Sequence, residues 1–72
     1  MPDQTTPPIL RYFEYAHLPE PLLSTSRNFS VLAHQLAAIL PACEERDVAL
    51  RKLLEAKDAG VRAALDLPRL DG

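Results

Sequence analysis

The stretch from Glu44 to Leu65 constrains the fold most strongly, because no proline interrupts its helical pattern. It predicts one helix of about six turns at 3.6 residues per turn, with apolar residues on two faces. The stripe of large residues comprises Leu50, Leu54, Val61 and Leu65, and the stripe of mostly small residues comprises Ala49, Leu53, Ala56, Gly60 and Ala63. Gly60 costs about 1 kcal/mol relative to alanine inside a helix, which a close approach of another helix would justify. Since a helix of a two-helix protein needs only one buried face, the second stripe predicts a further packing partner.

A second helical segment, from about residue 19 to residue 40, precedes this stretch. Pro19 and Pro21 suit the first turn of a helix, where the missing N–H group would have no partner in any case. The apolar seam of this segment has heptad-like spacing and comprises Leu22, Phe29, Leu32, Leu36 and Ile39. Pro41 ends the segment, and the short connection predicts an antiparallel pair with the later helix, at about 43–65.

The beginning of the chain has a different composition. The first ten residues carry three of the seven prolines and show no periodicity, so we expect residues 1–10 to form a disordered tail. Three of the four aromatic side chains follow between Leu10 and Leu18. No other segment reads as a strand, so we expect an extended aromatic arm or a single turn here. The hairpin domain is then expected at residues 11–66, with a C-terminal tail at 67–72.

The chain is short and has little to reinforce it. A domain of 72 residues buries only about 60% of the surface that its unfolded chain exposes. Its one cysteine, Cys43, excludes an intrachain disulfide and suits a reducing cytoplasm. Cys43, His17 and His34 do not have the spacing of metal ligands, so we expect no metal and no cofactor. Oligomerisation is therefore the expected source of additional stability.

Charge and motifs exclude several functions. The net charge of −2, with basic and acidic residues mixed, argues against binding to duplex nucleic acid. No apolar stretch approaches the roughly 20 residues of a membrane span, and no signal peptide is recognisable, so we expect a cytosolic protein without membrane association. The chain has two glycines and hence no glycine-rich phosphate loop, and neither a Ser–His–Asp set nor a carboxylate pair can be assigned. We therefore expect that it is not an enzyme.

Two groups of residues are candidates for ligand binding. Tyr12, Tyr15 and His17 in the arm combine flat rings with polar tips, which suits stacking on a nucleobase and bonding to its edge. The alternative for the arm is a hydrophobic lid over the helical core, a role that suits Phe13. Early in the first helix, five consecutive polar residues from Ser24 to Asn28 form a cluster, whose candidate ligand residues are Ser24, Ser26, Arg27 and Asn28. A guanidinium beside hydroxyl groups suits phosphate, and a plain solvated surface is the alternative.

Arg62 is a separate candidate near the end of the second helix. It either faces an anion held between subunits or forms a surface ion pair with Asp58, which lies one turn earlier.

The order of these features is distinctive. The arm with Tyr15, His17 and Pro19 is followed by the Arg27 cluster, Leu32-Ala33, the Leu40-Pro41 turn, Glu45-Arg46, and the pattern Ala49-Leu50, Lys52-Leu53 and Glu55-Ala56. From about Arg11 to Leu65, this order resembles the hairpin domain of phage anti-CBASS cyclic-oligonucleotide sponges, a domain that is shared with anti-Thoeris sponges.

The resemblance implies an all-α antiparallel two-helix hairpin that assembles into a compact homo-oligomer, a hexamer in the family. Such proteins bind cyclic dinucleotides such as cyclic GMP-AMP between protomers, and some also bind cyclic trinucleotides in separate pockets. They sequester these immune second messengers in the host cell cytoplasm without cleaving them. By the same resemblance, Tyr15 is the base-stacking residue with Tyr12 as its substitute, Arg27 contacts phosphate, and Arg62 belongs to the second site.

The alternative interpretation needs no nucleotide. The small-residue stripe of the second helix alone suits a helical-hairpin module for oligomerisation or for protein–protein interaction.

Overall fold

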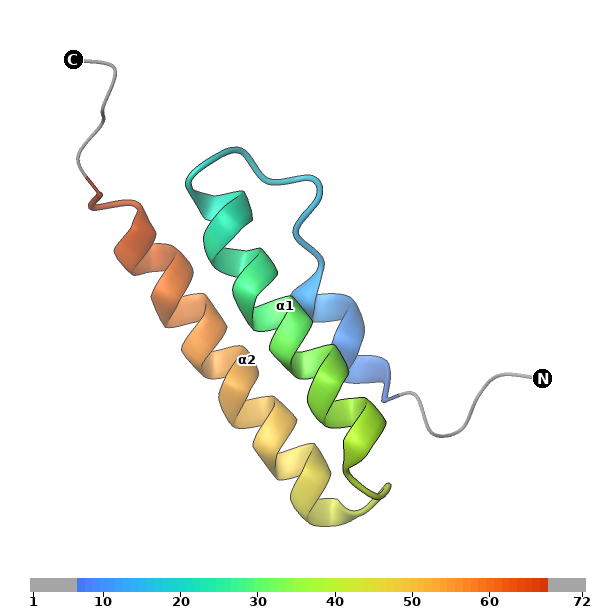
Figure 1. Cartoon of the computed structure of the whole chain (residues 1–72). Helices are drawn as coiled ribbons and strands as arrows, with labels where there is room; N and C mark the ends of the chain where they lie inside the picture. Colours follow the sequence, from blue (N-terminus) through green and yellow to red (C-terminus); the bar gives the residue numbers. More distant parts are fainter. Residues whose placement is uncertain (1–6, 68–72) are drawn as a thin grey trace.

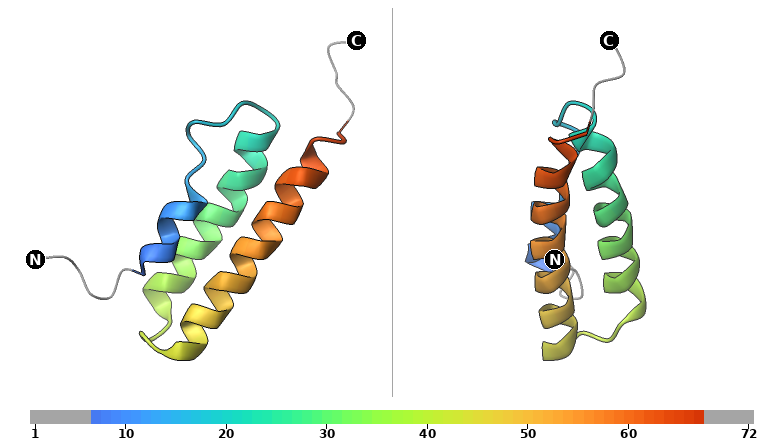
Figure 2. Two further views of the ribbon diagram at one scale, coloured as in Figure 1. Left: turned by 180° about the vertical axis from the view of Figure 1, so that it is seen from behind. Right: turned by 90° about the vertical axis from the view of Figure 1, so that its left-hand side faces the viewer.

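The computed structural model describes residues 7–67, and this part of the chain is helical without a strand (Figure 1). A short 3-10 helix, η1 (Pro8–Phe13), precedes two long helices, α1 (Leu22–Ile39) and α2 (Glu44–Ala64). The two long helices run antiparallel, side by side, and are joined by a short turn (Figures 1 and 2). η1 packs against both of them, so the chain is a helical hairpin with a helical turn laid on one side.

The first long helix begins later than predicted. Pro19 and Pro21 both lie before α1, and Pro21 is its N-terminal cap residue. The residue before a proline is disfavoured in the α conformation, so Glu20 cannot readily extend the helix backwards through Pro21. At the other end, Leu40 is already extended, with φ −91° and ψ 144°. The prediction of 19–40 was therefore wrong by about one turn at the start, whereas the prediction of 43–65 for α2 was confirmed to within one residue at each end.

Of the two alternatives for the aromatic segment, an extended arm or a single turn, the turn is found, since Pro8–Phe13 form the 3-10 helix η1. The prediction of a disordered tail at 1–10 was wrong for Pro8, Ile9 and Leu10, which belong to this helix. The Leu10 N–H donates to the Pro7 carbonyl oxygen at 3.2 Å, and a repeat of three residues places Leu10 and Phe13 on one side of the turn. Both side chains are buried in the hairpin. Hence the packed domain begins before residue 11, and of the expected tails the ranges 1–6 and 68–72 lie outside the described residues.

The core lies where η1 meets the two long helices. Its buried centre comprises Leu10, Phe13, Ala33 and Leu50, and the partly buried residues around it are Ile9, Phe29, Leu36, Ala37, Leu53 and Leu54. Phe13 is completely buried, which confirms the interpretation of this side chain as a hydrophobic lid. The large apolar residues of the large-residue stripe of α2 are buried or half-buried as far as Val61, whereas most of the small-residue stripe is exposed in the single chain.

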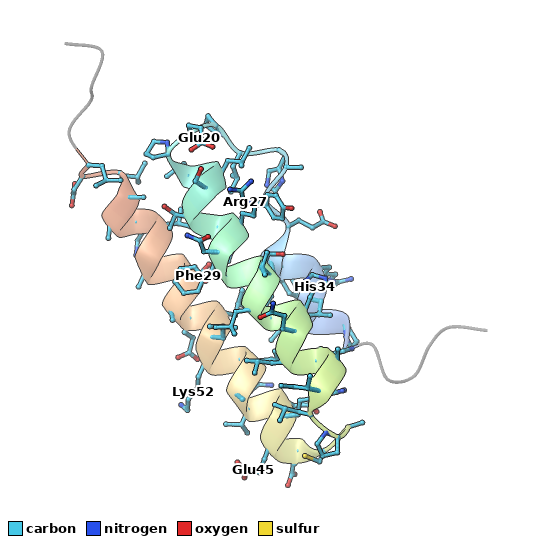
Figure 3. The ribbon with its side chains drawn as sticks, in the orientation of Figure 1. Glu20, Arg27, Phe29, His34, Glu45 and Lys52 are labelled. Carbon is cyan, nitrogen blue, oxygen red and sulfur yellow. The ribbon has the colours of Figure 1, made fainter. Side chains whose placement is uncertain are left out.

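Gly60 marks a close contact between the two long helices. A Cβ atom at Gly60 would lie 3.0 Å from Cε2 and 3.1 Å from Cζ of Phe29, whose ring lies between α1 and α2 (Figure 3). A glycine in mid-helix is therefore explained by the ring of Phe29 packed on its backbone.

This contact predicts the effect of Gly60→Ala. Alanine improves helix propensity by about 1 kcal/mol, but its methyl group would displace the ring, and such overpacking typically costs about 1–3 kcal/mol. We expect a net loss of about 1 kcal/mol in the free energy of unfolding, measured by urea denaturation. Ala59→Gly, at the neighbouring exposed position, measures the difference in helix propensity between alanine and glycine in α2 without the contact with Phe29. If Gly60→Ala instead raised the free energy of unfolding by about 1 kcal/mol, the close packing of Phe29 on Gly60 would be contradicted.

Candidate functional site

An open depression lies between η1, the irregular segment that follows it, and α1. We call it the arm pocket; it has a volume of about 550 Å³, and its lining includes Leu10, Arg11, Tyr15, His17, Ser30 and His34. Tyr15 is half-buried and His17 is exposed, so the pocket offers one half-buried ring and one accessible ring. Two of the residues predicted for ligand binding, Tyr15 and His17, thus share one site.

The shape of the arm pocket is maintained by local hydrogen bonds. The Leu18 N–H donates to the Tyr15 carbonyl oxygen at 2.9 Å, which closes a turn around His17. On the opposite wall, His34 Nδ1 lies 2.8 Å from the carbonyl oxygen of Ser30. Because a carbonyl oxygen can only accept, Nδ1 carries the proton, and in the neutral ring Nε2 is left as an acceptor. The pocket therefore combines an aromatic face with a ring nitrogen of fixed orientation.

Arg27 is exposed on α1 and does not line the arm pocket. It precedes His34 by seven residues, which is close to two helical turns, so the two side chains share a face of α1. Figure 3 shows both on the side of α1 that is away from α2. Arg27 therefore flanks the pocket along α1 without being part of its wall.

The remaining polar residues of the Arg27 cluster do not converge. The Ser24 hydroxyl donates to the Glu20 carboxylate, whose oxygens lie 2.8 and 2.7 Å away. Ser26 is completely buried and its Oγ has no partner, whereas Asn28 is exposed. Ser24 shares a face of α1 with Arg27 and Asn28, because they are three and four residues apart, but its hydroxyl is bonded to Glu20. Ser26 points about 100° away from Arg27 and into the hairpin. In the single chain, the four polar side chains therefore do not form one site.

Tyr12 faces a second open depression, between η1 and the first half of α2. We call it the η1–α2 depression; it has a volume of about 420 Å³ and its lining includes Pro8, Arg11, Tyr12, Asp47 and Arg51. The two tyrosines of the arm thus point into different depressions, and Arg11 lines both of them.

Arg11 is a residue that the sequence analysis missed. Its Nη2 donates to the Tyr12 hydroxyl at 2.9 Å, and its Cζ lies 5.0 Å from the centroid of the Tyr12 ring. The hydrogen bond to Tyr12 raises the pKa of the Arg11 guanidinium above its ordinary value. The only sequence signal for this arrangement is a basic residue directly before a tyrosine in an aromatic segment.

Arg62 lies in the last turn of α2, where a positive charge suits the helix dipole. The ion pair that was considered between Asp58 and Arg62 is not formed. Asp58 pairs instead with Lys57, at 3.0 Å. The structure does not bring Arg62 together with the residues of the arm pocket.

Arg46 is a second residue that the sequence analysis did not single out. It is buried, with 5% of its surface exposed, and its Nη1 donates to the Ala37 carbonyl oxygen at 3.2 Å. Ala37 belongs to the last turn of α1, whose carbonyl groups have no partner within the helix. Arg46 therefore ties the first turn of α2 to the last turn of α1 and fixes the closed end of the hairpin.

Among residues 7–67, His, Cys, Asp and Glu side chains do not gather in any group of three or more that could hold a metal ion. None of the helices in this part of the chain has both the length and the apolar character needed to cross a membrane.

Comparison with known proteins adds no further constraint. No protein-family model matches the chain, and neither a curated protein nor a solved structure shows significant similarity to it.

Proposed function

We propose that this chain is a phage anti-defence protein that binds and sequesters cyclic dinucleotide second messengers in the host cell cytoplasm, without cleaving them. The observation that supports this most strongly is the arm pocket, in which the half-buried Tyr15 offers an aromatic face beside His17 and His34. Stacking on an aromatic side chain contributes about 1–3 kcal/mol per base. The resemblance of the chain, from Arg11 to Leu65, to cyclic-oligonucleotide sponges names the ligand class.

In this proposal a base of the ligand stacks on Tyr15, and the histidine side chains bond to its edge. The phosphate contact falls to Arg27, which is exposed and flanks the pocket on α1. Among the described residues, no side-chain hydrogen bond or ion pair engages its guanidinium. A symmetric oligomer presents each arginine more than once. Two copies of Arg27 across a two-fold axis would meet the two phosphates of a cyclic dinucleotide.

The proposed assembly is a homo-oligomer, a hexamer by the resemblance. It is supported by the large apolar side chains that the single chain exposes: Val31, Leu32, Ile39, Val48, Leu65 and Leu67. Ile39 is 74% exposed at the end of α1, and a chain of this size gains stability when a partner covers such side chains. A second site for cyclic trinucleotides, which includes Arg62, is also part of the proposal.

Thermal denaturation with and without a cyclic dinucleotide tests the proposal. A ligand that binds only the native state at a hundred times its Kd stabilises the protein by about 2.7 kcal/mol, so the Tm should rise. Tyr15→Ala should reduce this rise strongly, because the stacking face is lost. Tyr12→Ala is the matched control, since it removes the same side chain from the other depression. A larger loss with Tyr12→Ala than with Tyr15→Ala would mean that the arm pocket is not the site.

A second candidate function is a hairpin module for oligomerisation or protein–protein interaction, without a nucleotide ligand. The same exposed apolar side chains favour it. The two functions differ in the thermal experiment: an interaction module keeps its Tm in the presence of every cyclic nucleotide, whereas a sponge does not.

A further inference from the structure

The η1–α2 depression contains two arginines that come from different elements. Arg11 belongs to η1 and Arg51 to α2, and both line the depression together with Tyr12 and Asp47. The charged lining therefore has two positive groups and one negative group. Of these four residues, only Tyr12 was predicted to bind a ligand, so the depression needs an interpretation of its own.

Arg11 has an orientation that suits anion binding. Its guanidinium is held against Tyr12 by the 2.9 Å hydrogen bond and by the ring below it. This bond uses one of the five N–H donors of the guanidinium, so the other donors remain for a ligand. A side chain that is already oriented loses less conformational freedom when it binds.

The guanidinium of Arg51 is also available to bind an anion. Asp47 precedes it by one helical turn, at a spacing that permits an ion pair, but the one ion pair within 4.0 Å among the described residues joins Lys57 and Asp58. The Arg51 side chain is exposed and lines the depression. Its planar fork of N–H groups matches the oxygens of a phosphate group.

We propose that the η1–α2 depression binds a phosphate group between the guanidinium groups of Arg11 and Arg51. Arg11 supplies an oriented fork from η1, Arg51 supplies a second fork from α2, and Asp47 limits the affinity by repelling the anion. This site shares Arg11 with the lining of the arm pocket but does not include Tyr15, and it does not rest on the proposed function.

Inorganic phosphate is the probe that tests this site. The full chain is titrated at pH 7 and constant ionic strength, with chloride replaced by phosphate, and the arginine Nε–H signals are followed by NMR spectroscopy. We expect the signals of Arg11 and Arg51 to move along one saturation curve, while that of the buried Arg46, which is bonded to the Ala37 carbonyl oxygen, stays in place. No movement at Arg11 and Arg51, separate saturation curves for the two, or equal movement at Arg46 would overturn the proposal.

Two charge variants should change the phosphate affinity in opposite directions. Arg51→Gln should weaken phosphate binding about three- to fivefold, the range of an exposed ion pair, and Asp47→Asn should strengthen it by a similar factor. Lys52→Gln and Glu45→Gln make the same changes of charge on the side of α2 that faces away from η1 (Figure 3). Both controls should leave the affinity unchanged. If they change it as much as the variants at Arg51 and Asp47 do, the effect is one of net charge and the proposal fails.

Discussion

Phe13→Ala should lower the free energy of unfolding by about 3–5 kcal/mol, as expected when a fully buried phenylalanine is truncated in a core. Phe13 is completely buried at the point where η1 meets Ala33 and Leu50. A domain of 72 residues has a total stability of about 4–11 kcal/mol at 0.05–0.15 kcal/mol per residue. The substitution should therefore remove a large share of the stability of this chain.

Urea denaturation followed by circular dichroism measures this effect, and Tyr12→Ala is the matched control. Tyr12 belongs to the same 3-10 helix but is 53% exposed, so its truncation should cost less than about 1 kcal/mol. Equal losses for the two variants would show that η1 is not part of the core. Since η1 also carries Arg11 and leads into Tyr15, loss of its packing should disturb both depressions.

Arg46→Ala should have the second largest effect, a loss of about 2–3 kcal/mol. The substitution removes the hydrogen bond to the Ala37 carbonyl oxygen, which contributes about 1–2 kcal/mol. It also removes the packing of a buried aliphatic stem at the closed end of the hairpin.

Arg46→Met separates these two contributions. Methionine restores the packing without the hydrogen bond, and it also removes the buried Nε that has no partner. We therefore expect Arg46→Met to lie between the wild type and Arg46→Ala in urea denaturation. A loss below about 0.5 kcal/mol for Arg46→Ala would contradict the role of Arg46 in joining the helices.

The two long helices were predictable because their signals are local. The apolar repeat of α2 and the proline at position 41 define a helix, a stop and a short turn. The close approach at Gly60 was also expected from its position in mid-helix, although its partner, Phe29, becomes visible only in the structure.

The arm could not be predicted in the same way. A 3-10 turn of six residues has little intrinsic stability, and the hairpin that Leu10 and Phe13 pack against provides the reason for η1 to form. For the same reason, the residues that line the arm pocket could not all be identified from the sequence. Ser26 directly precedes Arg27 in sequence but is buried on another face of α1, whereas His34 joins the arm pocket from a position distant from Tyr15 in sequence.

Arg46 was missed because it lies among exposed acidic residues at the start of α2 and reads as one more surface charge. Its burial follows from the position of the α1 terminus across the turn, which no local pattern encodes.

Isothermal titration of the full chain with cyclic GMP-AMP tests the central proposal most directly, with chromatography of the ligand after the titration. We predict saturable binding, a strong loss of affinity in Tyr15→Ala, and recovery of the ligand intact. An absence of heat with cyclic GMP-AMP and with a panel of other cyclic dinucleotides and trinucleotides, or recovery of a cleaved ligand, would contradict the proposal that this chain is a sponge.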